Sequence, residues 1–391
     1  MENQSTETAA AWRWPDLAPN VIPREIFSRQ DVYELELERI FRGPTWHLIA
    51  HAAELPEPSG FKSAYCGDVP LIISRGTDGR IRSFRNACAH RGTMVETRLR
   101  GTARSFQCPY HRWTFDSTGK LVGCPGEEDF PESFRREDFG LHEVRTEEFL
   151  GLIFVTLDPR TESLDDYMGD TKDAVRESLG GDGNLQLLGY QKALFNCNWK
   201  IHVDQDGYHP PLLHSAFRLM NWQGGQGEIN FDSRANMVLT YETVPYSDNG
   251  FLNDPSVVEV KRRHRLNKSR VITLFPANFL ADHLDTINMR FIRPLAPDKT
   301  EVHYTYFARK DDDPEYLRHR IRQSSNLLGP AGLVSFDDAT VFLRTTRADS
   351  ARVDNTFLKG YRDAGLPDHW PQNTEAPNIV RWQAYREMMG L

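Results

Sequence analysis

The sequence lacks any run of apolar residues long enough to cross a membrane. No stretch of the 391-residue chain approaches 18 consecutive apolar residues, so we expect no transmembrane helix. The segment Met1 to Trp14 is polar and acidic, and it has no apolar region of the kind found in signal peptides. The sequence therefore predicts a cytoplasmic location.

Cysteine and excess positive charge are also scarce. The chain has five cysteines, an odd number, and without a secretion signal this predicts reduced thiols rather than a disulfide framework. The net charge of −8 leaves no basic surplus to neutralise phosphates, which argues against a nucleic-acid-binding protein. Hydrophobic content of 39% and charged content of 26% are those of an ordinary globular protein, long enough for two domains.

The sequence pattern of residues 45–158 is typical of a small all-β domain. Short apolar or alternating runs are separated by glycine, proline and aspartate, and we expect strands at 71–74, 81–86, 105–108, 113–115 and 151–157. Asp78-Gly79 and Ser117-Thr118-Gly119 are typical of hairpin turns. Before this domain, residues 1–44 predict an arm and an amphipathic helix over 29–41, capped by Ser28, packing on the second domain.

Residues 159–391 predict a larger domain, so that the whole chain is α+β. We expect a helical stretch to about residue 179, loops over 222–270 with a solvated basic turn at 261–265, and strands at 271–275, 286–293 and 301–308, with a turn at 294–299. A helix should start at Pro314 and end before Gly329-Pro330. The result is an antiparallel sheet flanked by helices, in a helix-grip-like arrangement.

One motif repeats a cysteine and a histidine. Cys88-x-His90 is followed, after seventeen residues, by Cys108-x2-His111. Each short loop offers one thiolate and one imidazole, which is the ligand set of a mixed [2Fe–2S] centre with two Cys on one iron and two His on the other. Zinc modules use Cys-x2–4-Cys spacing instead, so a structural zinc site is the weaker interpretation. Cys66, Cys124 and Cys197 are then spare, and we expect them to be small buried residues.

A second cluster predicts a mononuclear metal. Asp206, His209 and His214 lie close together, and two histidines completed by a distant carboxylate leave open positions at Fe(II). The candidate carboxylates are Asp338 and, as the fallback, Asp337. Pro210-Pro211 disfavours one regular helix through the two histidines. Taken singly these residues are ordinary, and His202 and His283, which have no partner pattern, are expected to be structural.

With these motifs in place, the chain resembles the α (catalytic) subunit of a Rieske non-haem iron aromatic-ring-hydroxylating oxygenase over nearly its whole length. The resemblance implies that Cys88, His90, Cys108 and His111 hold the Rieske [2Fe–2S] cluster, and that His209, His214 and Asp338 hold mononuclear non-haem Fe(II). The Asn198-Trp199-Lys200 stretch matches the start of the family's iron-binding segment. The chain is two or three residues shorter than many relatives between Trp199 and His209, with Asp204-Gln205 where an acidic-Asn pair is common.

The resemblance also implies partners. An NAD(P)H-dependent flavin or iron–sulfur reductase, with or without a ferredoxin, would supply electrons, and O2 and an aromatic small molecule would be the substrates. Asp206 would bridge His209 to the cluster ligand His111 of the next subunit, so the family's unit is a homotrimer, α3, or α3β3 with a small β subunit. We expect neither nucleic acid nor membrane as a partner.

The reaction implied is cis-dihydroxylation of an aromatic ring. One alternative is monohydroxylation, or oxidative O- or N-demethylation, on the same iron, and the iron ligands alone cannot distinguish these reactions from dihydroxylation. An alternative of another class is a Rieske electron carrier without oxygenase activity. The Gly329-Pro330-Ala-Gly-Leu stretch resembles members that act on aromatic acids. A substrate carboxylate could form a bidentate pair with an arginine, and the candidates are Arg290, Arg293 and Arg344, although each also suits a structural role.

Overall fold

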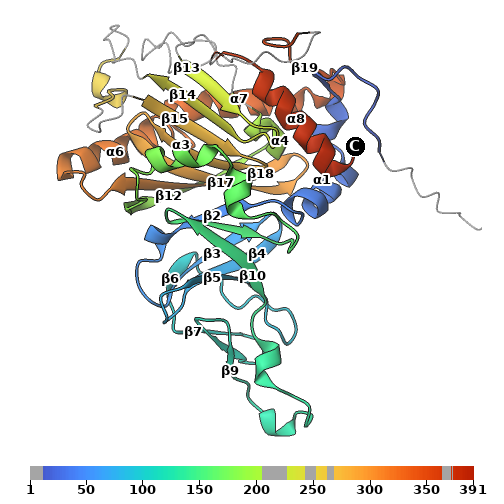
Figure 1. Cartoon of the computed structure of the whole chain (residues 1–391), viewed down its shortest axis with the longest axis vertical. Coiled ribbons are helices and arrows are strands. Elements are labelled where there is room, and N and C mark those ends of the chain that lie inside the picture. The colour runs from blue at the N-terminus through green and yellow to red at the C-terminus, as the bar shows by residue number, and fades with distance from the viewer. Residues whose placement is uncertain (1–11, 205–226, 243–251, 262–267, 363–370, 372) are drawn as a thin grey trace, which may run out of the picture.

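The computed structural model describes all residues except 1–11, 205–226, 243–251, 262–267, 363–370 and 372. In this part of the chain, two seven-stranded antiparallel sheets follow one another along the long axis of the molecule (Figure 1). We call them the amino-terminal sheet, drawn below, and the carboxy-terminal sheet, drawn above. No helix of the described residues is long and apolar enough to cross a membrane.

The amino-terminal sheet has the strand order β2-β11-β10-β5-β4-β3-β6, and a three-stranded sheet, β7-β8-β9, lies beyond it (Figure 1). The strands are β2 (His47–His51), β3 (Gly60–Cys66), β4 (Val69–Arg75), β5 (Ile81–Arg85), β6 (Arg100–Thr102), β7 (Ser105–Gln107), β8 (Thr114–Asp116), β9 (Leu121–Gly123), β10 (Glu143–Phe149) and β11 (Leu152–Thr156). The five strands predicted here are confirmed as β4, β5, β7, β8 and β11, with small shifts at their ends. The all-β character of this half is therefore confirmed.

Both predicted hairpin turns join neighbouring strands. Gly79 and Gly119 have left-handed φ angles of 79° and 84°. A Cβ atom at Gly119 would lie 2.4 Å from the ring of Phe84, so this turn needs glycine for its backbone angle and for space.

The two sheets meet through β2 and β11, which are buried along their whole length. Leu48 and Phe154 pack into a cluster with side chains of the carboxy-terminal sheet, whereas Ile49 and Val155 pack into the amino-terminal half. Asn278 of the carboxy-terminal sheet fastens this junction. Its Oδ1 accepts a hydrogen bond from the Leu48 N–H at 2.7 Å, and its Nδ2 donates to the Trp46 carbonyl at 2.8 Å.

The carboxy-terminal sheet has the order β12-β18-β17-β16-β15-β14-β13. Its strands are β12 (Leu185–Phe195), β13 (Gly227–Phe231), β14 (Met237–Glu242), β15 (Lys268–Leu274), β16 (Asn278–His283), β17 (Thr286–Ala296) and β18 (Lys299–Arg309). The prediction of loops over 222–270 is wrong where β13, β14 and the start of β15 form. Only Ile229 of β13 is fully buried, which is too weak a pattern to read from sequence. Residues 262–265 of the predicted basic turn lie outside the described residues.

The predicted turn at 294–299 is also too long. Pro294 lies within β17 and pairs with Thr300, at a place where the register shifts before Ala296. A proline is tolerated in a strand at such an irregularity because the ladder hydrogen bond is already interrupted there. The turn therefore shrinks to residues 297–298.

The helices are α1 (Gln30–Glu36), α2 (Leu164–Met168), α3 (Thr171–Ser178), α4 (Trp199–Val203), α6 (Pro314–Asn326), α7 (Leu333–Arg347) and α8 (Ala376–Met389). A π-helix, η2 (Leu37–Phe41), continues α1, so a helical segment over 29–41 is confirmed. Its predicted cap is wrong, because Arg29 stands at the N-cap and Ser28 ends the preceding helix η1 (Arg24–Phe27). The predicted start of α6 is confirmed, with Asp313 as its cap.

Shorter elements complete the described chain. They are β1 (Val21–Ile22), which pairs with β19 (Asn355–Thr356), and the 3₁₀ helices η3 (Ala52–Glu54), η4 (Glu127–Asp129), η5 (Arg136–Phe139), η6 (Pro255–Val257) and η7 (Asp349–Ala351). The stretch predicted as helical up to residue 179 is divided into α2 and α3 at Gly169, whose φ is 49°.

The carboxy-terminal sheet has two differently covered faces. Ile287 and Met289 face β2, α2 and α3, while Tyr304 and Tyr306 face α1, α4, α7 and α8. The sheet flanked by helices confirms the predicted α+β class, whereas the division of the chain at residues 44 and 158 stays a prediction.

Candidate functional site

The four predicted cluster ligands lie on two loops of the amino-terminal half, one after β5 and one between β7 and β8. In each loop the chain turns back on its cysteine. The Gly92 N–H donates to the Cys88 carbonyl at 2.8 Å, and the Arg112 N–H donates to the Cys108 carbonyl at 3.0 Å. Gly92 and Arg112 have left-handed φ angles of 70° and 61°. The repeated motif thus produces a repeated turn.

Across the two loops, cysteine lies beside cysteine and histidine lies beside histidine. Cys88 and Cys108 are buried, and burial raises the pKa of the Cys88 thiol, with a further upward effect from the neighbouring Cys108. The rings of His90 and His111 have centroids 4.7 Å apart. Two thiols side by side and two imidazoles side by side are the donor set of a cluster in which each iron takes one pair, so these residues fit a [2Fe–2S] centre.

Aromatic packing orients the two imidazoles. Trp113 stacks on His90 with centroids 4.8 Å apart and planes 10° apart, and Tyr110 lies 3.8 Å from His111. Within the described ranges, no three or more His, Cys, Asp or Glu side chains gather at a point that could hold a single metal ion. The two-by-two arrangement therefore differs from a mononuclear site.

Of the predicted mononuclear ligands, only the carboxylates can be placed, because Asp206, His209 and His214 lie outside the described residues. Asp338 and Asp337 lie on α7, which begins at Leu333, shortly after Pro330. Asp338 is one turn from Phe342, which is buried against Phe195 of β12 with ring centroids 6.2 Å apart.

Arg290 lies on the face of β17 that the helices cover. Its side chain is buried between the rings of Phe279, at 4.3 Å, and Tyr304, at 4.9 Å. Its only hydrogen bond within the described chain is a long one, 3.4 Å from Nε to Asn288 Oδ1, and no carboxylate there pairs with it. Burial raises the pKa of Tyr304, Arg290 lowers it and Asp338 raises it, so the guanidinium and the Asp338 carboxylate both lie near this ring.

The other two predicted arginines lie elsewhere. Arg293 pairs with Glu301 at 3.4 Å and stacks over Tyr65 of β3, on the opposite face of β17 from Arg290. Arg344 is exposed on α7. The structure thus separates the three candidates, and only Arg290 combines burial with the absence of an acidic partner in the described part of the chain.

His202, which we expected from the sequence to be structural, is buried near Arg290. It lies on α4 between Phe195 and Phe342, with centroid distances of 5.2 and 5.4 Å, and its Nδ1 has no hydrogen-bond partner among the described residues. Burial, and then Arg290, lower the pKa of this imidazole to about 3, so it is neutral. The structural role of His202 stays a prediction.

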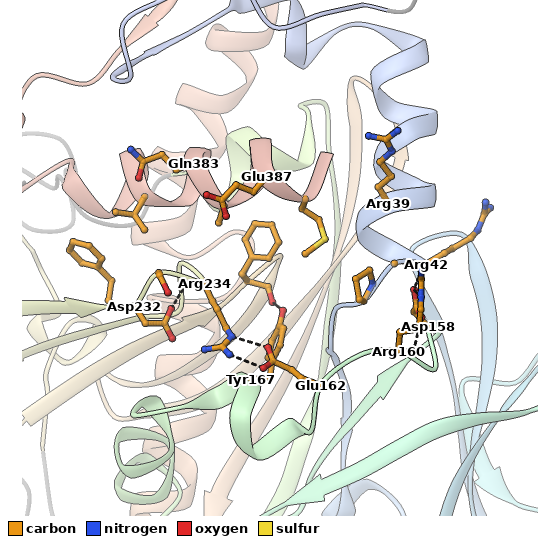
Figure 2. Close-up of a pocket in the computed structure, with 18 of the residues that line it drawn as sticks. Arg39, Arg42, Asp158, Arg160, Glu162, Tyr167, Asp232, Arg234, Gln383 and Glu387 are labelled. Atoms are coloured by element: carbon orange, nitrogen blue, oxygen red, sulfur yellow. Dashed lines mark hydrogen bonds and ion pairs between the residues drawn. The ribbon is translucent and has the colours of Figure 1, made fainter. Parts of the chain in front are cut away.

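A large cavity of about 1210 Å³ lies outside this region, between α2, the β13–β14 turn and α8 (Figure 2). Two of the arginines that line it pair with carboxylates. Arg234 binds Glu162 at 2.7 Å and Arg160 binds Asp158 at 2.6 Å. None of the predicted site residues that the structure describes lines it.

Comparison with known proteins gives two family matches. Residues 45–135 match the Rieske [2Fe-2S] domain, and residues 165–357 match the ring hydroxylating alpha subunit (catalytic domain). The anthranilate 1,2-dioxygenase large subunit of Burkholderia cepacia is 30% identical over 399 residues, with 94% of this chain and 93% of the relative covered. The large oxygenase component of salicylate 5-hydroxylase from Ralstonia sp. is 29% identical, with 97% and 96% covered.

A solved structure is similar over the same length. Naphthalene 1,2-dioxygenase from Rhodococcus sp., bound to indole, superposes with a TM-score of 0.81 at 26% identity, covering 94% of each chain. The two matched domains use a Rieske cluster and mononuclear non-haem iron, which confirms both predicted cofactors and is at odds with a zinc module or a simple electron carrier. The chain belongs to the ring-hydroxylating α-subunit family of Rieske oxygenases, terminal oxygenases that take electrons from a partner reductase and hydroxylate aromatic substrates.

Proposed function

We propose that this chain hydroxylates an aromatic carboxylic acid, by cis-dihydroxylation of the ring. The observation that carries the substrate class is Arg290, a buried guanidinium without an acidic partner among the described residues. A buried charge needs a compensating charge, and a carboxylate matches the planar fork of arginine. Anthranilate and salicylate, the compounds in the names of two relatives, are aromatic carboxylates, which supports the same class.

We assign the iron ligands as His209, His214 and Asp338, and the cluster ligands as Cys88, His90, Cys108 and His111. For the carboxylate, helix geometry favours Asp338 over Asp337. Asp338 shares a helix face with the buried Phe342, whereas Asp337 is four residues from Val341, which is 44% exposed. When bound, the cluster supplies electrons and the mononuclear iron activates O2.

The protein's own side chains would hold the substrate. Arg290 would receive the carboxylate through two hydrogen bonds, and this would fix which ring carbons face Asp338. Tyr304, Phe195 and Phe342 belong to one buried cluster, and their rings would pack against a planar aromatic substrate. His202, as a neutral imidazole beside Arg290, adds a polar group without adding charge.

We propose the partners that the family resemblance implies. These are an NAD(P)H-dependent flavin or iron–sulfur reductase, with or without a ferredoxin, and a homotrimer that a small β subunit would extend to α3β3. Asp206 would accept hydrogen bonds from His209 and from His111 of the partner subunit, which fixes the tautomers of both rings. An Asp206→Ala variant should keep both metals and lose activity; full turnover would refute this bridge.

Monohydroxylation is the second candidate outcome. The name of the salicylate relative is that of a 5-hydroxylase, at an identity close to that of the anthranilate relative. The same pocket and carboxylate anchor serve either outcome. Turnover under labelled O2, with mass spectrometry of the product, counts the inserted oxygen atoms and separates the two.

The test of substrate class compares an aromatic acid with its neutral amide in the reconstituted enzyme. For Arg290→Gln we expect kcat/KM on the acid to fall roughly 100-fold, mainly through KM, because the variant loses a desolvated charge pair. Turnover of the amide should change little. Arg293→Gln is the matched control, since Arg293 lies on the same strand but on the opposite face.

Two results would contradict the proposal. If the wild-type enzyme prefers the amide, or a neutral arene, to every acid in the panel, then an aromatic carboxylic acid is not its substrate class. An Arg290→Gln variant that loses activity equally on acid and amide would show that Arg290 supports the fold rather than the carboxylate. Thermal unfolding of each variant accompanies the kinetics.

A further inference from the structure

The short helix α4 leads directly into the segment that carries the proposed iron histidines. All five of its residues are buried. Its N-cap is Asn198, whose side chain accepts from the Lys200 N–H at 2.9 Å and donates to the carbonyls of Phe27 and Pro297 at 3.0 and 2.7 Å. A helix this short leaves the carbonyls of its last turn without internal partners, so something else must bind them.

The carboxy-terminal helix α8 supplies those partners. Asn378 Nδ2 donates to the backbone carbonyl of Asp204 at 2.6 Å and to its Oδ1 at 2.8 Å. Arg381 donates to the carbonyl of Val203. Asn378 and Arg381 are 3% and 6% exposed, so these bonds lie in the interior. The side-chain amide of Asn378 thus binds both the main chain and the side chain of Asp204, which directly precedes the undescribed residues 205–226.

The other end of α4 is held through a buried carboxylate. Glu36 of α1 accepts from Trp199 Nε1 at 2.7 Å and from the Tyr385 hydroxyl at 2.6 Å, and it pairs with the Lys200 ammonium. Asn378, Arg381 and Tyr385 are spaced three and four residues apart and therefore share one face of α8. That face lies against α4, on the same side of the carboxy-terminal sheet as α1 (Figure 1).

We infer that α8 positions the iron-binding segment, and that Asn378 is the positioning residue, because it sets the direction in which the chain leaves α4 at Asp204. This inference rests on the proposed ligands, the nearest of which, His209, lies five residues further on. Outer partners that orient metal ligands typically change metal affinity 10- to 100-fold when removed. The contact spans more than 170 residues of sequence, so no local element could supply it.

The test uses the holoenzyme and the variant Asn378→Leu, which keeps the size of the side chain and removes its amide. The mononuclear iron should dissociate about 10- to 100-fold more readily, measured by chelator competition, while the visible spectrum of the Rieske cluster stays that of wild type. Asn378→Gln keeps a donor and should recover part of the affinity. Gln383→Leu, an exposed change on the same helix, should retain wild-type affinity.

A purely structural role gives a different pattern. Val380→Ala creates a small cavity under α8 without touching α4's carbonyls, so it should lower the melting temperature and leave iron affinity unchanged. Wild-type iron affinity in Asn378→Leu, or equal iron loss in Val380→Ala at an equal melting temperature, overturns the inference. His209→Ala tests the ligand assignment separately, because iron retained there would remove that assignment while leaving the Asn378 result readable.

Discussion

Three buried histidines make the protein sensitive to acid at the level of single residues. Burial lowers the pKa of His47 and His51 to about 4, and of His202 to about 3. All three are therefore neutral in the fold. The unfolded chain takes up protons below about pH 6.5, so the folded state binds fewer protons and loses stability as the pH falls from there towards the folded values.

We expect the free energy of unfolding to fall by about 1 kcal/mol for each of these histidines between about pH 6.5 and 5.5, or about 3 kcal/mol together. Urea denaturation across this range measures the change. His202→Leu should flatten the pH dependence by about a third, since the Nδ1 atom of its imidazole has no hydrogen-bond partner among the described residues. The matched control is the exposed His142→Asn, which should leave the slope unchanged; equal slopes for both variants would contradict the prediction.

At the residue scale, some site features could be predicted from the sequence and others could not. The Cys88, His90, Cys108 and His111 pairing was visible because the motif repeats. The difference between Arg290 and Arg293 was not visible, because it depends on which face of β17 the helices cover. That face is set by contacts with α4, α7 and α8, and nothing within residues 286–296 encodes it.

At the scale of elements, α1, α4 and α8 share one buried polar junction around Glu36. Burial lowers the pKa of Lys200, and the charge of Glu36 opposes that shift. The pair is 3% and 0% exposed, so either partner alone would leave a charge buried without compensation.

We predict that Lys200→Met costs about 3 kcal/mol of folding free energy, because Glu36 then keeps only the neutral donors Trp199 and Tyr385. The double variant Glu36→Gln with Lys200→Met should cost less than the sum of its single changes, by about 0.5–3 kcal/mol. Chemical denaturation of all four proteins completes the cycle. Strict additivity would show that the two charges do not interact.

Elements differ in how well the sequence indicated them. The amphipathic helix over 29–41 and the helix at Pro314 were visible from periodicity and capping, while the cap at Ser28 was misplaced by one residue because η1 precedes α1. β13 was missed because it buries a single isoleucine fully. The contacts from Glu36 to Lys200 and from Asn378 to Asp204 join residues 164 and 174 positions apart, and no local pattern reports such distances.

At the scale of the whole molecule, one side-chain amide joins the two sheets by hydrogen bonds. Asn278 satisfies the Leu48 N–H and the Trp46 carbonyl across the junction, and all three groups are buried. A second link joins the sheets at β12, where the Lys62 ammonium pairs with Glu54 at 2.7 Å and the Tyr190 hydroxyl donates to the same carboxylate.

Asn278→Ala should leave two buried backbone groups unpaired, at a cost of about 1–3 kcal/mol each. Hydrogen exchange should quicken in β2, over residues 47–51, and stay unchanged in β7–β9. Asn230→Ala, on the exposed side of β13, is the matched control. Unchanged exchange in β2 would show that apolar packing alone holds the sheets together.

The hydrogen bonds from α8 to the end of α4 have a consequence for synthesis on the ribosome. The strands and turns of residues 47–156 bond mainly to one another, so the cluster half can fold as it emerges. Val203 and Asp204 must wait for Asn378 and Arg381, which are translated about 170 residues later. At 5–20 residues per second that delay is roughly 10 to 35 s, so the end of α4, which leads to the proposed iron ligands, receives its hydrogen bonds only when translation is nearly complete.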